Sequence, residues 1–567
     1  MLMTTVSARL ATVLAAHVDQ AFALMGNGNA WFLDALRTTD MRITAVRHET
    51  ATVASADAYH RVCGRVGLAT MTYGPGFTNT VTSLAEAAQA RTPLLVVAGA
   101  APTTGPRPWD VDQTAIAAAV GVPTYTVDAG TPGRVAVEAL HHALARRTPV
   151  ILALPYDLVN APTAEDDDVP ALPALPTPPG PGGADVARVA EVLGAAARPL
   201  ILAGRGAKAA AVQVRELADR LGAVTASSAP ARGLFAGRPY DLGVAGGFAS
   251  VPSAELIHAA DVVLAVGAGL NQFTTAFGQA FAPHARVIQV DLAEHALHPA
   301  VTDVVRGDAS IVVRALADEL ADHPRPDRPW GGAAETARDG RLIFEREPGE
   351  RAAPDGRLDP RSVMRRLDAV LPADRVVVSD GGHFIGWANT YLDLPAADSI
   401  TLVGTAFQSI GLGFPSAPGA AAARPDATVV VVTGDGGGLM GLPDLDSLAR
   451  AAASAIVLVF NDAAYGAEVH QYGSQGLDQD IMLIDEVDFA RVATGFGCAS
   501  AVVRTFDDLD AIEAWVADGA RGTFVADLRV SREVVAPYIL EIIEATLKAP
   551  KPGDPSSAEA AGALTEA

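Results

Sequence analysis

A short glycine-rich segment with one acidic side chain is the strongest candidate for chemistry in this sequence. Thr433-Gly434-Asp435-Gly436-Gly437-Gly438 directly follows an apolar run and precedes a helical stretch. Backbone N–H groups in such a turn can approach a phosphate closely. Asp435 offers a hard oxygen ligand for Mg²⁺, and Asp462, 27 residues later at the end of the next predicted strand, offers a second. Taken alone, the segment is equally typical of an ordinary glycine-rich turn with a capping Asp.

Two segments in the N-terminal third are weaker candidates. Arg47-His48-Glu49-Thr50 precedes an apolar helical stretch, where a carboxylate could act as a buried proton carrier. By itself, Glu49 is also an ordinary acid at a helix start, where the positive end of the helix dipole favours it. Gly74–Asn79 is a tight turn into a helix and is weak evidence on its own.

The elements that must position these residues alternate along the chain. Short apolar runs without polar alternation predict strands covered on both faces, and Ala-rich helical stretches separate them. This order predicts parallel sheets wound by helices, with ligands at the carboxyl ends of the strands. The predicted strands are Ala21–Met25, Gly67–Thr72, Pro93–Ala98, Pro149–Leu154, Pro199–Ala203, Asp261–Val266, Arg286–Asp291, Arg375–Ser379, Thr428–Thr433, Ala455–Phe460 and Thr523–Leu528.

Two shifts in composition divide the chain. Asn160–Gly183 contains an acidic run followed by repeated Pro and Gly, which is typical of a linker, and Asp322–Asp359 is polar and rich in Pro, Arg and Glu. The sequence therefore predicts an α/β protein of three doubly wound parallel-sheet domains, with a disordered C-terminal tail. The predicted boundaries are 1–160, 184–322 and 360–547 for the domains and 548–567 for the tail.

Composition excludes several classes of protein. Half of the 567 residues are hydrophobic, which is enough for a large core and excludes disorder for the bulk of the chain. A net charge of −23 without any Lys/Arg run argues against a nucleic-acid partner. Two cysteines, Cys63 and Cys498, cannot form a disulfide framework or a Cys-based zinc site, which fits a cytoplasmic protein. No apolar run is long enough to span a membrane, and the N-terminus lacks the pattern of a signal peptide.

Taken together, the motifs resemble those of thiamine diphosphate (ThDP) enzymes. The segment around Asp435, with Asp462 after it, resembles the diphosphate and metal motif of that family, usually Gly-Asp-Gly followed by Asn-Asn; here Asp462 replaces the second Asn. Arg47–Glu49 resembles the segment of the catalytic glutamate, Gly74–Asn79 the turn after it, and Gln408–Gly413 the stretch that holds the bent cofactor. The resemblance covers nearly the whole chain and is greatest to acetolactate synthase-like proteins, with benzaldehyde lyase and 2-oxo acid decarboxylases as near neighbours.

The resemblance implies a pyrimidine-binding first domain, a Rossmann-like middle domain and a diphosphate-binding third domain. It implies that Glu49 hydrogen-bonds the pyrimidine nitrogen, that the carbonyl of Gln408 accepts from the pyrimidine amino group, and that Ile410 lies under the bent cofactor. Asp435, Asp462 and the carbonyl of Ala464 would bind Mg²⁺. Other cofactor-binding residues would be Gly436, Gly437, Gly382, His383, Phe384, Tyr465 and Asn79.

Residues around the substrate follow less directly from the resemblance. Gln113 is similar to an active-site glutamine and could donate to a substrate carbonyl or carboxylate; it could also be a polar surface residue. Polar residues expected to line the pocket, although turn chemistry or surface position explains them equally well, are Asn27, Asn29, His470 and Gln471. Because Glu49 and the metal motif lie in different domains, the resemblance implies a homodimer or homotetramer with active sites at the subunit interface.

The expected activity is a ThDP- and Mg²⁺-dependent decarboxylation of a 2-oxo acid, with transfer of the acyl carbanion to a second carbonyl. One alternative is a lyase or carboligase of 2-hydroxy ketones, as in benzaldehyde lyase; others are a flavin-linked oxidase and a non-catalytic ThDP-binding regulatory protein. Acetolactate synthases usually carry a Trp where Gln471 stands here, so the acetolactate product does not follow from the resemblance. Leu202–Gly206 and Gly267–Asn271 suit a Rossmann-like domain but do not establish FAD binding.

Overall fold

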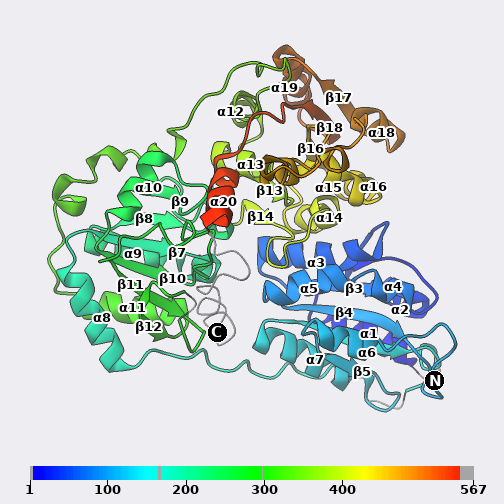
Figure 1. Ribbon diagram of the computed structural model, residues 1–567. Coiled ribbons are helices and arrows are strands. Elements are labelled where there is room, and N and C mark those ends of the chain that lie inside the picture. The colour runs from blue at the N-terminus through cyan, green and yellow to red at the C-terminus, as the bar shows by residue number, and fades with distance from the viewer. Residues whose placement is uncertain (1–3, 164–167, 297, 549–567) are drawn as a thin grey trace.

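Three parallel sheets organise the molecule. The computed structural model describes residues 4–163, 168–296 and 298–548. Among these residues, eighteen strands form three six-stranded sheets in which every strand pairing is parallel, and helices cover both faces of each sheet (Figure 1). The predicted fold class, α/β with three doubly wound parallel-sheet domains, is confirmed.

The N-terminal sheet has the order β2-β1-β3-β4-β6-β5. Its inner strands are apolar and buried on both faces, as a covered parallel sheet requires. The strands are β1 Gln20–Ala23, β2 Arg42–Ala45, β3 Leu68–Met71, β4 Leu94–Ala100, β5 Thr124–Thr126 and β6 Pro149–Pro155. The helices are α1 Val6–Ala15, α2 Ala30–Leu36, α3 Glu49–Cys63, α4 Pro75–Thr78, α5 Val81–Gln89, α6 Gln113–Ala119 and α7 Pro132–Arg146.

The middle sheet has the order β12-β11-β10-β7-β8-β9. A Rossmann-like arrangement follows from strand crossovers on both sides of β7. The strands are β7 Pro199–Ala203, β8 Val224–Ser227, β9 Asp241–Val244, β10 Val262–Val266, β11 Arg286–Asp291 and β12 Val301–Arg306. The α-helices are α8 Gly183–Ala195, α9 Ala211–Leu221, α10 Val251–His258 and α11 Ala309–Glu319.

The C-terminal sheet has the order β14-β13-β15-β16-β18-β17. Its strands are β13 Arg375–Ser379, β14 Ile400–Leu402, β15 Thr428–Gly434, β16 Ser454–Asn461, β17 Ala499–Val503 and β18 Gly522–Arg529. The helices are α12 Pro360–Val370, α13 Ile385–Tyr391, α14 Gly413–Ala423, α15 Asp435–Met440, α16 Asp444–Ala451, α17 Gly466–Gln471, α18 Phe489–Gly495, α19 Asp510–Ala517 and α20 Pro537–Lys548. In Figure 1, α20 (red) lies between the middle domain and the C-terminal domain.

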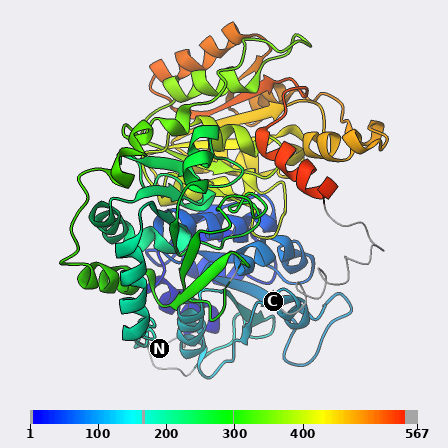
Figure 2. The same cartoon turned by 60° about the vertical axis from the view of Figure 1, so that its left-hand side comes forward.

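The N-terminal and C-terminal domains pack against each other through α3 and α14. The Ser55 hydroxyl of α3 donates to the carbonyl of Pro415 (2.7 Å). A Cβ atom at Gly419 would lie 1.9 Å from the carbonyl oxygen of Ser55, so only glycine allows this close approach. Figures 1 and 2 show the two domains stacked along this contact, with the middle domain beside them.

Every strand predicted from sequence is an inner strand of its sheet. The six strands at the sheet edges were not predicted, because they lack a continuous apolar run: β12, for example, alternates between exposed and half-buried residues over most of its length. The inner strand β8 was also missed. The tail was predicted from residue 548, but Lys548 is the last residue of α20, because the apolar periodicity of that helix extends to it. The rest of the predicted tail and most of the acidic run of the first linker lie outside the described residues.

In the described part of the chain, no helix is both long and apolar enough to cross a membrane.

Candidate active site

Two buried carboxylates lie at the ends of neighbouring strands. Because β15 pairs in parallel with β16, Asp435 and Asp462 follow strand ends that are side by side. Asp435 Oδ1 accepts from the N–H of Gly436 (3.0 Å), whereas its Oδ2 is buried without a hydrogen-bond partner. Burial raises the pKa of both carboxyl groups, and the charge of Asp435 raises that of Asp462 further. This is a donor set that a cation would satisfy.

Glycines keep the surroundings of these carboxylates clear of side chains. A Cβ atom at Gly436 would lie 2.7 Å from the Tyr465 ring, and one at Gly466 would lie 2.7 Å from Asp462 Oδ2. At Gly437 it would lie 3.0 Å from a carboxylate oxygen of Asp380. The backbone therefore forms a cradle in which phosphate oxygens and a hard cation fit, and which larger residues would fill.

Asp380 is a central residue of this site that the sequence reasoning missed. It follows β13, is fully buried, and accepts hydrogen bonds from the N–H groups of Gly381 (2.8 Å), Gly411 (3.1 Å) and Leu412 (3.3 Å). The hydroxyl of Thr433, next to the glycine turn, also donates to it (3.3 Å). Burial raises the pKa of Asp380 to about 6. The sequence feature that could have identified Asp380 is an acidic residue followed by two glycines directly after a predicted strand.

The loop that Asp380 holds presents an apolar side chain outward. Gln408 has a φ of 63°, in the left-handed region that non-glycine residues rarely adopt, and its side chain is exposed. Ile410 is 40% exposed although it is a large apolar residue in an ordered loop. A Cβ atom at Gly381 would lie 3.2 Å from Ile410, which leaves the other side of Ile410 open.

His383 connects this site to the C-terminal segment. Its Nε2 accepts from the N–H of Ala536 (2.9 Å), and the hydroxyl of Tyr538 donates to the carbonyl of Gly382 (2.8 Å). Burial lowers the pKa of His383 to about 3, with a smaller contribution from His470, so the ring is neutral and its proton lies on Nδ1. That nitrogen lies 3.5 Å from a Cβ atom placed at Gly466, one of the glycines that border the cradle.

Three further predicted residues surround this histidine. Phe384 stacks on Phe460 with ring centroids 6.1 Å apart and packs against Gly382 and Gly434. The ring of His470 lies 4.8 Å from that of His383, and its Nε2 is buried without a hydrogen-bond partner; burial lowers its pKa. Gln471 follows at the end of α17 and is half-buried. Among the described residues, the Nε2 of His470 therefore has no hydrogen-bond partner.

The N-terminal domain gathers a second group of predicted residues. Glu49 is the first residue of α3, and its Oε2 accepts from the Asn79 amide (3.0 Å). The carbonyl of Asn79 in turn accepts from the Thr50 hydroxyl (2.5 Å). A Cβ atom at Gly76 would lie 3.6 Å from Glu49 Oε1. The turn Gly74–Asn79 therefore orients the Glu49 carboxylate.

The other polar residues of this domain have partners within it. Gln113 donates to the carbonyl of Gly99 (3.0 Å) and accepts from the N–H of Gly74 (2.9 Å), so it ties β4 to the turn. Asn29 is fully buried; its amide accepts from the N–H of Gly26 and donates to Leu24 and Thr70, which stabilises its own turn. Asn27 is exposed and donates to the Tyr73 hydroxyl (2.8 Å).

Within one copy of the chain the two groups stay separate. Among the described residues, no hydrogen bond or ion pair joins Glu49 to Asp435 or Asp462. The nearest polar connection runs from the Arg47 N–H to Asp444 (2.9 Å) and from its guanidinium to Asp446 (2.5 Å). In a single chain, the residues around Glu49 and the residues around Asp435 and Asp462 are therefore two separate polar groups.

We predict that Asp380→Ala destabilises the C-terminal domain by about 2–4 kcal/mol, because it leaves several buried N–H and O–H donors unpaired. Asp380→Asn keeps one acceptor oxygen and should lose less. Thermal unfolding measures the effect, and limited proteolysis reports on the loop around Gln408. Asp374→Ala is the matched control, since Asp374 lies at the opposite end of β13, exposed, in an ion pair with Arg424. Equal melting temperatures for the two Ala variants would contradict the role given to Asp380.

Comparison with known proteins identifies the family. Three family models match: the N-terminal TPP-binding domain of thiamine pyrophosphate enzymes over residues 4–116, their central domain over 186–316, and their C-terminal TPP-binding domain over 380–526. Thiamine pyrophosphate is another name for ThDP.

Several curated proteins are similar along most of their length. A probable 2-ketoarginine decarboxylase of Pseudomonas aeruginosa is 29% identical, over 88% of both chains. A sulfoacetaldehyde acetyltransferase of Rhodobacter capsulatus is 29% identical, over 95% of this chain and 96% of its own. The large subunit of acetolactate synthase isozyme 2 of Escherichia coli is 26% identical, over 87% and 90%. With three domains matched in order and these relatives, this chain belongs to the thiamine pyrophosphate enzymes and is acetolactate synthase-like.

Proposed function

We propose that this protein is a ThDP- and Mg²⁺-dependent enzyme that decarboxylates a 2-oxo acid and transfers the acyl carbanion to a second carbonyl. The observation that carries the proposal is the buried pair Asp435–Asp462, with one unpartnered carboxylate oxygen, beside a glycine cradle. The relatives are named as a decarboxylase, an acetyltransferase and a synthase. Enzymes of these kinds form or cleave carbon–carbon bonds.

The residues at the ends of β15 and β16 fit the cofactor and its metal. Asp435, Asp462 and the carbonyl of Ala464 would hold Mg²⁺, and the N–H groups of Gly436 and Gly437 would approach the diphosphate. His383 Nδ1–H faces the same space and could donate to a phosphate oxygen. When bound, ThDP supplies a carbanion that adds to a carbonyl and then acts as an electron sink. FAD has no support in the middle domain and is not part of the proposal.

The protein's own part in the chemistry is to place protons and exclude water. Glu49, oriented by Asn79, would share a proton with the pyrimidine nitrogen. Ile410 would support the bent cofactor with its open apolar side. His470 is the best placed of the predicted pocket residues to move a proton, because its Nε2 has no partner. Gln113 and Asn29 would shape the substrate side of the pocket through the turns they stabilise, while Asn27 and Gln471 would border it.

The two groups would meet between two copies of the chain. Large apolar side chains are exposed in the segments that follow strands of both sheets: Trp109 is 59% exposed in the N-terminal domain, and Met440 at the end of α15 (54%) and Ile481 (82%) are exposed in the C-terminal one. Exposed apolar residues of this kind mark protein interfaces. We therefore propose a cytoplasmic homodimer or homotetramer whose active sites lie between subunits.

Substitutions at the two carboxylates test the metal site. We expect Asp435→Asn to weaken Mg²⁺-dependent ThDP binding at least about tenfold, whereas Asp462→Asn restores the usual family residue and binds within a few-fold. The pKa values of Asp435 and Asp462 are raised in the folded protein. The metal-free protein therefore loses stability as the pH rises from the ordinary carboxyl pKa through these raised values, because the buried carboxyl groups then ionise. Mg²⁺ with ThDP should accordingly raise the melting temperature more at about pH 8 than at about pH 6. A pH-independent shift would contradict the assignment.

Product analysis and a substitution of Glu49 test the proposed catalysis. With ThDP, Mg²⁺ and ¹³C-pyruvate, NMR of all carbon products separates acetolactate from acetaldehyde and acetoin; without turnover, bulkier 2-oxo acids and hydroxy ketones follow as donors. On any donor that turns over, Glu49→Gln should lower the rate at least about 100-fold with ThDP affinity within a few-fold, because the proton relay is lost. Glu138→Gln, on the exposed face of α7, is the control. Unchanged turnover of Glu49→Gln would refute the role of Glu49.

Mixing two inactive variants tests whether each active site is built from two subunits. Glu49→Gln and Asp435→Asn subunits, each inactive alone, should recover about a quarter of wild-type activity when co-expressed, because half of the dimers then contain one site with both native residues. The quarter refers to the unseparated mixture; mixed dimers isolated by two affinity tags should show about half of the wild-type activity. If each site is built from one chain, the mixed dimers have no intact site and stay inactive.

A further inference from the structure

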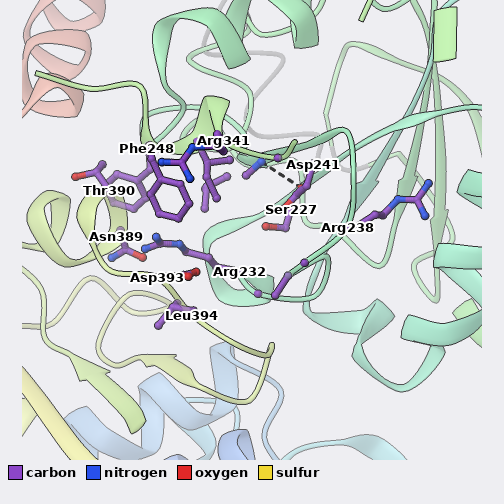
Figure 3. A pocket seen from close by; sticks show the side chains of 18 of the residues that line it. Ser227, Arg232, Arg238, Asp241, Phe248, Arg341, Asn389, Thr390, Asp393 and Leu394 are labelled. Carbon is purple, nitrogen blue, oxygen red and sulfur yellow. Dashed lines mark hydrogen bonds between the residues drawn. The ribbon is translucent and has the colours of Figure 1, made fainter. Parts of the chain in front are cut away.

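A cavity of about 270 Å³ lies where the middle domain meets the C-terminal domain. Its walls come from the segment around β8 and β9, from residues 339–346 of the linker, and from the end of α13 with the residues after it (Figure 3). Neither of the glycine turns at 202–206 and 267–271 lines it. Ser227 and Val244, the last residues of β8 and β9, do line it, so the cavity lies at the carboxyl ends of these two strands, to one side of the glycine turns.

Three guanidinium groups without an acidic partner face this cavity. Arg232 is buried and donates to the carbonyls of Ala388 (2.9 Å) and Leu392, and Arg346 donates to three carbonyls of its own surroundings. Among the described residues, neither they nor the exposed Arg341 form an ion pair. Burial lowers the pKa of both Arg232 and Arg346 to about 10, and the charge of Arg346 adds to the effect on Arg232.

Among the other charged groups of the lining, Asp393 acts on Arg232, where burial lowers the pKa and the charge of Asp393 offsets part of that effect; the rest are held elsewhere. Arg238 pairs with Asp219 outside the cavity (2.6 Å). Asp339 accepts from the backbone N–H of Arg341 (3.0 Å), and Asp241 is half-buried and accepts from the N–H of Gly243 (3.2 Å). Burial raises the pKa of Asp241 to about 6. Asp393 is the third acid, and it is exposed.

Figure 3 shows Arg232 and Arg341 on either side of Phe248, with Asn389 and Thr390 of α13 nearby, while Arg238 points away from them. In a protein with a net charge of −23, the lining carries four arginines and three aspartates, so the arginines form a locally cationic grouping. It is the arrangement that a bound oxyanion would complete, because guanidinium groups match phosphate and carboxylate oxygens.

We propose that this cavity binds a small metabolite through a phosphate or carboxylate group, held by Arg232, Arg341 and Arg346. The volume limits the ligand, because about 30 Å³ holds one water molecule and a dinucleotide needs several times the space present here. The opening beside exposed Arg341 provides the entrance.

Occupancy of the cavity would reach the cofactor segment by two routes. Arg232 holds the C-terminal carbonyls of α13, and this helix begins directly after Gly382–Phe384. Phe248 contacts the Tyr538 ring (5.5 Å between centroids), whose hydroxyl bonds the carbonyl of Gly382. A bound anion would therefore stabilise this segment and tighten ThDP binding. This consequence, unlike the binding itself, rests on the proposed function.

The test is calorimetric titration of the holoenzyme, with ThDP and Mg²⁺ saturating, with inorganic phosphate in one arm and malonate in the other. Saturable binding in either arm is expected, and the stronger arm identifies the group. Arg341→Met removes the guanidinium but keeps an apolar stem, and should weaken binding about tenfold. Arg338→Met, which removes an exposed, ion-paired arginine three residues earlier, should change it less than about twofold.

Absence of saturable binding in both arms would overturn the proposal, as would equal affinity of Arg341→Met and wild type. Asp435→Asn keeps the cavity and should bind the anion as tightly as ThDP-free wild type does while binding ThDP at least about tenfold more weakly, so failure of the proposed function leaves a separate signature. Thermal shifts with each anion confirm that the Arg341 variant is folded. Coupling predicts that the better anion also lowers the ThDP dissociation constant, and by reciprocity that ThDP strengthens anion binding.

Discussion

Two negative charges buried side by side are the constraint around which this molecule is organised. Parallel pairing of β15 with β16 brings Asp435 and Asp462 together, and burial with mutual repulsion disfavours their ionised forms. A cation removes that penalty only if nothing else fills the space. The surrounding glycines, each in contact with a ring or a carboxylate, meet this condition. The local fold is thus shaped for a charged ligand at a cost to its stability without one.

Long-range hydrogen bonds then hold the remaining parts of the site. Asp380 fastens the loop before α14 to two strands, and His383 and Gly382 fasten the C-terminal segment through Ala536 and Tyr538. Tyr538 also packs with Phe248 and Phe273 of the middle domain. His383, Tyr538 and the backbone groups are neutral, and the Asp380 carboxylate accepts from several N–H and O–H donors that offset its buried charge, so these contacts add rigidity. The middle domain thereby supports a site to which it contributes no predicted ligand.

The sheets show why sequence patterns predict some elements and miss others. Inner strands such as β13 and β15 are apolar on both faces and were predicted nearly to the residue. Edge strands such as β2 and β12 are covered on fewer sides, so their sequences carry polar residues and resemble loops. The ends of the inner strands position the site. Because these strands are predicted well, the sequence also predicts that Asp435 and Asp462 lie close together.

The sequence by itself determined the fold class, the strand ends and the residues with cofactor chemistry, because these depend on short spacings and on apolar runs. Only the tertiary structure decided that Asp380 organises the site, that the proton of His383 lies on Nδ1, and that Asn29 and Gln113 are engaged within their own domain. It also revealed the arginine-lined cavity. Its walls come from three separate segments, within 227–248, 339–346 and 389–394. No sequence motif predicts that these segments meet, because only packing of the domains brings them together.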